Sequence, residues 1–380
     1  MGRMYMIKRM DIQTLVNSYD KDHITIGVLG GHSGLDVCRG AKKHGFSTLA
    51  VCQKGREKTY TRYYKTREGK GCIDETILLD KFSDITKPAV QKELREKNTI
   101  FIHNRYFWVY FDFKDIENTF NVPIFGTRSM LKLEERDVPK NQYYLLEKAG
   151  IRFPKIITSP KDIDRLVIVK VNEAIRGYER AFFYATTYDD YKKKASELLN
   201  KKMITKEALD KAVIEEYVIG AQVNFNYFYS VIDDELEIVG TDTRRQTNLD
   251  GLIRLPANEQ LEVLKYLNPK IIETGHIAAT TKESIIEKIF DIGEKFVKTT
   301  KKECPPGIIG PFALQGAIAA DKGKEEMVVF DVSMRIPGSP LTRFTPHSGY
   351  LYGESISYGE RIAMEIKKAI KAGRLGDIIT

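Results

Sequence analysis

The fold of the first part of the chain is decided by residues 24–34, which read ITIGVLGGHSG. The apolar run from Ile24 to Leu29 ends in two glycines, as a buried strand that enters a tight turn does. Leu35 to His44 then has the pattern of a helix, and Phe46 to Gln53 reads as the next strand. Strand, glycine-rich turn, helix and strand start a parallel α/β sheet, in which ligands bind at the carboxyl ends of the strands.

The same unit extends on both sides of this stretch. Residues 1–20 contain a short helical stripe of Ile12, Leu15 and Val16, and Thr99 to His103 predicts a further strand. Residues 1–130 are therefore predicted to form one α/β domain.

From residue 131 to 380 strands and helices mix without strict alternation, which predicts an α+β fold. An antiparallel pair is expected around Asp233-Asp234, and a second pair of apolar strands around the turn at residues 321–326. The helix that carries Ile285, Ile289, Ile292 and Phe296 is expected to begin at a capping box formed by Thr280 and Glu283. Further helices are predicted at Lys132–Lys148, Tyr188–Leu199, Lys206–Ala212 and Glu360–Ala372, and a strand at Ile168–Val171.

The composition excludes several classes of protein. The 380 residues are 42% apolar, which is enough for packed cores and argues against a disordered chain. The net charge of +8 comes from interspersed charges of both signs, whereas nucleic-acid binders concentrate theirs, so no nucleic-acid partner is expected. No apolar run is long enough for a membrane span, and the first 25 residues contain no apolar core of the kind a secretory signal has. With scattered cysteines (Cys38, Cys52, Cys72 and Cys304), we expect a reduced, cytoplasmic protein with no membrane partner.

Three sets of residues could carry chemistry. The loop containing His32 and Ser33 precedes a helix and could bind a phosphate, as could Lys54 and Arg56 after the next strand. A tight turn without a ligand remains the alternative for the loop, and a charged surface loop for the two cations.

Lys170 follows an apolar run and could reach a nucleotide phosphate, while Glu215 to Val218 could offer backbone groups to an adenine. Gln315 and Asp331 each lie within an apolar strand-like run, where an uncompensated carboxylate is costly. Such oxygen donors suit Mg²⁺ held mainly by nucleotide phosphates. An ion pair with Arg335 is the alternative for Asp331.

The order of these features resembles an ATP-grasp fold, and several stretches resemble one family closely. They are Gly40–Thr48, Cys52–Glu57, Val122–Gly126, Leu146–Arg152, Asn248–Arg254 and Ile309–Phe312. The family is the archaeal formate-dependent 5-formaminoimidazole-4-carboxamide ribonucleotide (FAICAR) synthetase of purine biosynthesis, and the resemblance runs from about residue 12 to 375. It implies an N-terminal preATP-grasp (Rossmann-like) domain followed by an ATP-grasp domain. The ATP-binding subdomain would span about 160–220, and the central and C-terminal parts 221–380.

The resemblance implies an ATP-dependent carbon–nitrogen ligase that uses ATP and Mg²⁺ (or Mn²⁺). Formate and ATP would give formyl phosphate, which would formylate aminoimidazole-carboxamide ribonucleotide (AICAR), and the family implies a homo-oligomer. By position, the catalytic residues would be Arg335 and His32, and the metal ligands Gln315 and Asp331. The substrate-binding residues would be His32, Ser33, Lys54, Arg56, Tyr106 and Asn248. The ATP-binding residues would be Lys170, Arg176, Glu215, Glu216, Tyr217 and Val218.

The chain departs from the family pattern at three places. Arg105 and Tyr106 replace a Gly-Ser pair, the loop at 174–181 keeps only Gly177 clearly, and Leu341 replaces an Asn near the metal. These changes predict a diverged paralogue. Two alternatives therefore stay open at this point: an ATP-grasp ligase with a different amine or carboxylate substrate, and a non-catalytic ligand-binding subunit.

Overall fold

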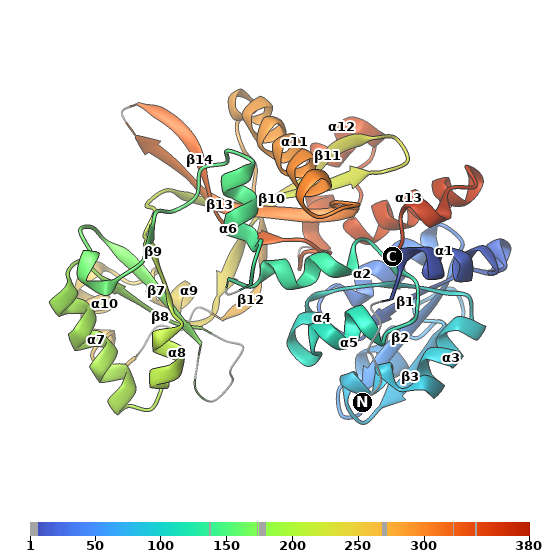
Figure 1. Cartoon of the computed structure of the whole chain (residues 1–380), viewed down its shortest axis with the longest axis horizontal. Helices are drawn as coiled ribbons and strands as arrows, with labels where there is room; N and C mark the ends of the chain where they lie inside the picture. The colour runs from blue at the N-terminus through green and yellow to red at the C-terminus, as the bar shows by residue number, and fades with distance from the viewer. Residues whose placement is uncertain are drawn as a thin grey trace.

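The computed structural model describes residues 7–136, 138–172, 174, 180–267, 272–321, 323–338 and 340–380. Their strands form a parallel sheet of five strands, an antiparallel sheet of four and an antiparallel sheet of five. In Figure 1 the parallel sheet lies on the right and the four-stranded sheet on the left, with the third sheet between and above them. No helix among these residues has the length and apolar character needed to cross a membrane.

The parallel sheet has the strand order β3-β2-β1-β4-β5 and is built from the N-terminal residues. Alternate side chains of its central strands enter two separate cores, so helices cover both faces. Helices α1 and α2 pack on one face, and α3, α4 and α5 on the other. The strands are β1 (Thr25–Leu29), β2 (Ser47–Gln53), β3 (Glu75–Leu79), β4 (Thr99–Ile102) and β5 (Ile124–Phe125), and the helices α1 (Arg9–Asn17), α2 (Gly34–Lys43), α3 (Pro88–Glu96), α4 (Arg105–Tyr110) and α5 (Phe113–Asn118).

The C-terminal residues return to this first sheet. Helix α13 (Tyr358–Lys371) crosses α2 so closely that a Cβ on Gly40 would lie 2.1 Å from the carbonyl carbon of Gly359. After α13, the backbone of Thr380 pairs with Ile124 of β5 through two hydrogen bonds of 2.9 and 3.0 Å. The buried guanidinium of Arg128 donates to the carbonyls of Ile116, Phe120, Val122 and Thr380.

The four-stranded sheet has the order β6-β9-β7-β8 with every neighbouring pair antiparallel. Helix α7 packs its buried Tyr191 and Ala195 against the sheet, in one core with Val167 and Val169 of β7. The strands are β6 (Ile156–Ile157), β7 (Val167–Asn172), β8 (Arg180–Ala185) and β9 (Val213–Glu216), and the helices α7 (Tyr188–Asn200) and α8 (Lys206–Asp210).

The third sheet has the order β12-β11-β10-β13-β14 and packs its apolar face against α11. Tyr227 and Phe312 stack with their ring centroids 4.9 Å apart, and Phe296 of α11 covers Phe312. The strands are β10 (Ala221–Ser230), β11 (Glu235–Gln246), β12 (Glu273–Ala278), β13 (Gly310–Asp321) and β14 (Lys324–Ser333). The helices are α6 (Gln142–Lys148), α9 (Thr247–Leu252), α10 (Ala257–Val263), α11 (Ile286–Glu303) and α12 (His347–Tyr352).

The expected mixture of a parallel α/β part and an antiparallel α+β part is confirmed. The single helix expected over Lys132–Lys148 is wrong. A 3₁₀ segment covers Arg128–Glu134 and α6 begins only at Gln142, because Pro139 lies between them and the Asn141 side chain caps α6 by accepting from the N–H groups of Tyr143 and Tyr144.

The capping box expected at Thr280 is also wrong. The chain enters a 3₁₀ turn at Glu283–Ile285 with Lys282 at its N-cap and no side-chain cap, and α11 follows directly from Ile286. The stripe of Ile289 and Phe296 is buried as expected, so apolar periodicity located the helix although the start signal did not.

Candidate active site

A polar pocket lies where the carboxyl edge of the parallel sheet meets the third sheet. The loop after β1 contributes His32 and the first turn of α4 contributes Arg105, while the other lining residues come from β10 to β14 and the loop that follows. Its empty space, including the part that opens to solvent, is about 340 Å³. Its lining side chains are His32, Arg105, Asn224, Asn226, Asp242, Arg244, Glu273, His276, Gln315, Ser333 and Arg335.

A row of polar residues crosses the third sheet at the floor of this pocket. Asp242 of β11 lies opposite Asn224 of β10, which lies opposite Gln315 of β13, which in turn lies opposite Asp331 of β14. Because side chains alternate along a strand, residues two positions apart share a face. Asn226 and Arg244 therefore join Asn224 and Asp242 on the pocket side of the sheet.

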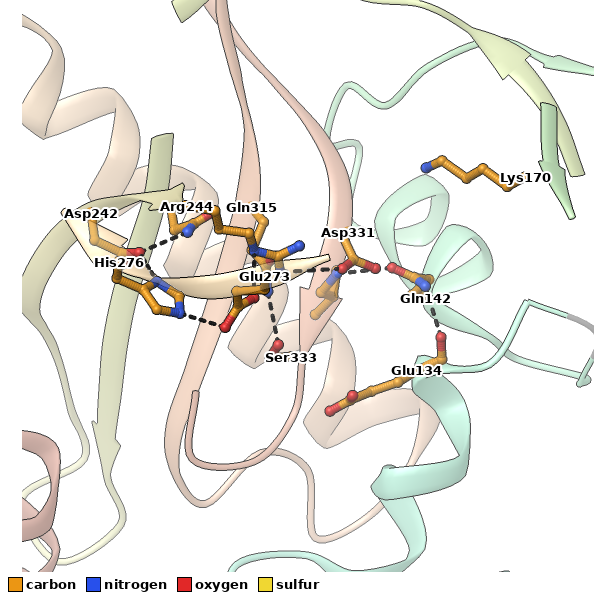
Figure 2. Close-up of polar contacts among 12 residues, drawn as sticks. Glu134, Gln142, Lys170, Asp242, Arg244, Glu273, His276, Gln315, Asp331 and Ser333 are labelled. Carbon is orange, nitrogen blue, oxygen red and sulfur yellow. Dashed lines mark hydrogen bonds and ion pairs between the residues drawn. The ribbon is translucent and has the colours of Figure 1, made fainter. Parts of the chain in front are cut away.

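His276 of β12 is held between two carboxylates, as Figure 2 shows. Its Nδ1 lies 2.5 Å from Asp242 Oδ2 and its Nε2 lies 2.7 Å from Glu273 Oε1. Burial by itself would lower the pKa of this imidazole, but the two carboxylates outweigh burial and raise the pKa to about 9. His276 is therefore positively charged at neutral pH. Asn224 and Asn226 donate to the same Asp242 carboxylate at 2.9 and 2.6 Å.

Arg244 of β11 lies between this clamped histidine and the two residues expected to bind metal. Its Nε is 3.3 Å from Glu273 Oε2 and its Nη2 is 3.8 Å from Asp331 Oδ2. The same guanidinium donates to Gln315 Oε1, whose amide nitrogen donates to Ser333 Oγ at 2.8 Å. Figure 2 shows these side chains converging from neighbouring strands.

Asp331 connects the pocket to the four-stranded sheet. Its other oxygen, Oδ1, accepts from Arg136 Nη2 at 3.0 Å, and Arg136 Nε donates to the Tyr143 hydroxyl at 3.0 Å. The Tyr143 hydroxyl donates to Glu215 of β9, which forms an ion pair with Lys170 of β7. A continuous polar network thus runs from Lys170 to the pocket.

The ammonium group of Lys170 is buried between the four-stranded sheet and β14. Burial lowers its pKa to about 8, although the Glu215 carboxylate partly offsets this effect. Its Nζ also lies 5.8 Å from the centroid of the Phe330 ring. A lysine in this environment is charged at neutral pH and can donate to a phosphate oxygen.

The hydrogen bonds of His32 define its tautomer. The Ser33 hydroxyl donates to the Pro337 carbonyl at 2.8 Å, so its oxygen must accept from His32 Nδ1, 3.0 Å away. Nδ1 therefore carries the proton and Nε2 is the acceptor. Burial and then the Arg335 charge lower the pKa of His32 well below its usual value, so the imidazole is neutral. Its Nε2 is thus a hydrogen-bond acceptor at the pocket, and the lowered pKa makes it a weak base that only a strongly acidic group would protonate at neutral pH.

Two further arginines line the pocket. Arg335, 8% exposed, donates to the carbonyl of Ile336 and lies 3.4 Å from Glu134 Oε2. Arg105 begins α4, and burial together with the Arg335 charge lowers its pKa. With Arg244, three guanidinium groups surround one small space, which suits an anionic ligand with several oxygens.

Other residues expected to bind substrate are not in the lining of this pocket. The Tyr106 ring packs so closely on the glycine loop that a Cβ on Gly31 would lie 2.0 Å from it. Arg56 Nη1 donates to the Tyr110 hydroxyl at 2.7 Å, and Lys54 pairs with exposed Asp80. Ser33 is buried and holds Pro337, and Asn248 lies in α9, directly after β11.

The residues expected to bind ATP lie mostly together on the four-stranded sheet. Glu215 and Glu216 end β9, next to Lys170 on β7. Tyr217 follows them, with its ring 4.9 Å from that of Tyr184, and Val218 comes next. Arg176 lies outside the described residues, as do most of the loop at 174–181 and the side chain of Leu341.

The donor set of Gln315 and Asp331 fits a divalent metal that nucleotide phosphates share. Both offer oxygen, which Mg²⁺ prefers, and together they supply only two protein ligands. Within the described residues no group of three or more His, Cys, Asp or Glu side chains is arranged to hold a metal. The ion pair considered for Asp331 does form, but with Arg136 and Arg244 rather than with Arg335.

Sequence reasoning did not identify several residues of this network: Arg136, Tyr143, Asn224, Asn226, Asp242, Arg244, Glu273 and His276. A signal was present in β10, where Asn224 and Asn226 recur at spacing two beside apolar residues. Strand β12 gave no comparable signal, since its segment is short and half-exposed.

The sequence is similar to known families and proteins along most of its length. Two family models match the chain, a "Protein of unknown function (DUF1246)" over residues 26–157 and a "Domain of unknown function (DUF1297)" over residues 190–380. A protein of Methanocaldococcus jannaschii named 5-formaminoimidazole-4-carboxamide-1-(beta)-D-ribofuranosyl 5'-monophosphate synthetase is 39% identical over 377 residues. The match covers 99% of this chain and all of that protein.

Solved structures of purine-biosynthesis proteins have a similar fold. The IMP biosynthesis protein PurP from Thermococcus kodakaraensis superimposes with a TM-score of 0.69 at 25% identity, covering 93% of this chain and 100% of that one. N5-Carboxyaminoimidazole synthetase from Staphylococcus aureus, complexed with ADP, gives a TM-score of 0.55 at 13% identity over 90% of this chain and 77% of that one. The expected ATP-grasp architecture with a preceding α/β domain is confirmed.

Proposed function

Because the chain belongs to the family of 5-formaminoimidazole-4-carboxamide-1-(beta)-D-ribofuranosyl 5'-monophosphate synthetases, we propose that it formylates AICAR with formate and ATP. It is an ATP-dependent carbon–nitrogen ligase whose products are FAICAR, ADP and phosphate. The observation that carries this proposal is the polar network that joins Lys170 to a pocket lined by three arginines. Full-length similarity to named synthetases favours this function over the alternatives of a changed substrate or a non-catalytic subunit.

The nucleotide is proposed to bind on the four-stranded sheet. Lys170 would donate to the phosphates, and the backbone of Glu216 to Val218 would face the adenine, with Arg176 as a further phosphate contact. Gln315 and Asp331 would hold Mg²⁺ or Mn²⁺, which neutralises phosphate charge. The pairing of Lys170 with Glu215 keeps the ammonium directed along the network that leads to Asp331.

AICAR is proposed to occupy the pocket with its phosphate near the arginines, within reach of His32. Ser33, Lys54, Arg56, Tyr106 and Asn248, which do not line the pocket, are proposed to contact parts of the ribonucleotide that extend beyond it. The pocket holds its three arginines in fixed positions, so they are oriented toward an anionic substrate before it binds.

The proposed chemistry has two steps. A formate oxygen attacks the γ-phosphorus of ATP, the bond to the bridging oxygen breaks, and formyl phosphate and ADP form. The 5-amino nitrogen of AICAR then attacks the formyl carbon, and phosphate leaves. Arg335 would stabilise charge on the transferring phosphoryl group, and the unprotonated Nε2 of His32 would accept the proton that the amine loses.

The test is a reconstituted reaction with ATP, Mg²⁺, formate and AICAR, in which ADP and FAICAR are separated by chromatography. We expect the two products in a ratio of one to one, and neither when formate is omitted. Lys170→Ala should abolish both, whereas Lys161→Ala, at an exposed lysine of the same region, should not. ADP release without a formylated product would contradict the assignment of AICAR as the amine.

A further inference from the structure

Arg244 lines the pocket proposed for AICAR, and it also contacts both residues to which metal binding is assigned. Its guanidinium donates to Gln315 Oε1 and lies 3.8 Å from Asp331 Oδ2 through Nη2. These are the oxygens that a divalent cation would need as ligands, at about 2.0–2.1 Å for Mg²⁺. The guanidinium and the metal therefore require the same lone pairs.

Arg244 also forms an ion pair with Glu273, which is not one of the two proposed metal ligands. Glu273 Oε2 is 3.3 Å from Arg244 Nε, and the second oxygen of Glu273 is held by the charged His276. The electrostatic attraction of Arg244 and His276 outweighs burial and lowers the pKa of Glu273 to about 2, so this carboxylate is ionised. A guanidinium displaced from Gln315 and Asp331 thus keeps a negatively charged partner.

Arg136 differs from Arg244, although both pair with Asp331. The side chain of Arg136 is 9% exposed and also donates to the Tyr143 hydroxyl, whereas that of Arg244 is 33% exposed. Arg136 also uses the other carboxylate oxygen, Oδ1. A metal can therefore reach Asp331 Oδ2 without disturbing Arg136, but not without moving Arg244.

We propose that Arg244 competes with the divalent metal for Gln315 and Asp331, so that the metal binds only when nucleotide phosphates add their own ligands and charge. The guanidinium then moves toward Glu273. This inference rests on the proposed metal site of the ligase. It makes Arg244 a positioning residue that couples metal entry to nucleotide binding.

The test measures Mn²⁺ binding by electron paramagnetic resonance of the free ion, with and without a non-hydrolysable ATP analogue. In Arg244→Met we expect Mn²⁺ to bind without nucleotide at least about tenfold more tightly than in wild type, because a repelling charge and a competing donor are removed. The matched control is Arg245→Met, since Arg245 pairs with Asp250 at 3.5 Å and not with the metal ligands. Circular dichroism checks that each variant is folded.

Two further variants separate the possible outcomes. Adding Asp331→Asn to Arg244→Met should remove the gained Mn²⁺ affinity, and Arg244→Lys, which keeps a charge, should lie between wild type and Arg244→Met. If Arg244→Met and wild type bound Mn²⁺ with equal affinity in the absence of nucleotide, the inference about Arg244 would be wrong. Loss of nucleotide-dependent Mn²⁺ binding in Asp331→Asn would support the proposed metal site independently of that result. If Asp331→Asn left that binding unchanged, the metal site itself would be wrong and the inference would fail with it.

Discussion

The clamped histidine predicts a pH-dependent stability that one substitution removes. His276 has a pKa of about 9 in place of 6.5, because its bonds to Asp242 and Glu273 outweigh its burial. A group whose folded pKa is raised contributes stability that is fully present below pH 6.5 and is lost as the pH rises through 9. The difference between the two pKa values corresponds to about 3 kcal/mol, at roughly 1.4 kcal/mol for each tenfold change.

The assay compares wild type with His276→Asn by urea unfolding, followed by circular dichroism, from about pH 6 to about pH 9. At about pH 6 the variant should have a lower free energy of unfolding than wild type, and this difference should decrease by about 3 kcal/mol as the pH rises to about 9. Removing His276 also removes a group that lowers the pKa of Asp242 and of Glu273, so the comparison starts at about pH 6, above the usual pKa range of carboxyl groups.

His347→Asn is the matched control. Burial lowers the pKa of His347, so this residue is neutral in both the folded and the unfolded protein above pH 7. The difference in free energy of unfolding between His347→Asn and wild type should therefore not change between pH 7 and pH 9. A histidine NMR titration reports the His276 pKa directly. A deficit of His276→Asn that does not change with pH, or a titration midpoint near 6.5, would refute the reasoning.

Three other predictions concern separate parts of the molecule. At pH 9 nucleotide binding should take up close to one proton, because the pKa of Lys170 is about 8 and a phosphate binds the charged form of its side chain. Calorimetry in buffers of different ionisation enthalpy measures this proton uptake, and the substitution Lys170→Met should remove it. Arg105→Gly should raise the KM for AICAR by about tenfold to a hundredfold with a smaller effect on the KM for ATP, as loss of one charge-assisted hydrogen bond would, and steady-state kinetics test this. Gly40→Ala should cost about 1–3 kcal/mol of stability in urea unfolding, because its Cβ would lie 2.1 Å from the backbone of Gly359, whereas Gly251→Ala, with open space around it, should be neutral or stabilising.

The sequence predicted the first sheet well because the signal there is local. The apolar run before Gly30, the helix that Gly45 ends and the strand that begins at Ser47 are each set by neighbouring residues. The helix expected from Lys132 was wrong because the prediction followed a local charge pattern alone. Its charge pattern continued across Pro139, whereas the observed start depends on a cap at Asn141.

The site was predicted only in part because most of it depends on pairing between distant strands. Lys170, Gln315 and Asp331 could be proposed from the sequence because each is a polar residue in an apolar run. Arg244 and His276 became recognisable only when β11 and β12 were paired, because Arg244 lies opposite His276 in that register. No single-strand pattern contains this information.

The return of the C-terminal residues to the first sheet has a consequence for biosynthesis. Arg128 and Thr380, which share a buried hydrogen bond, are 252 positions apart in the chain. During translation, the edge of β5 and one hydrogen bond of the Arg128 guanidinium therefore stay unsatisfied until residues about 250 positions later have left the ribosome. An N-terminal fragment expressed without those residues would expose that strand edge, which is a template for aggregation.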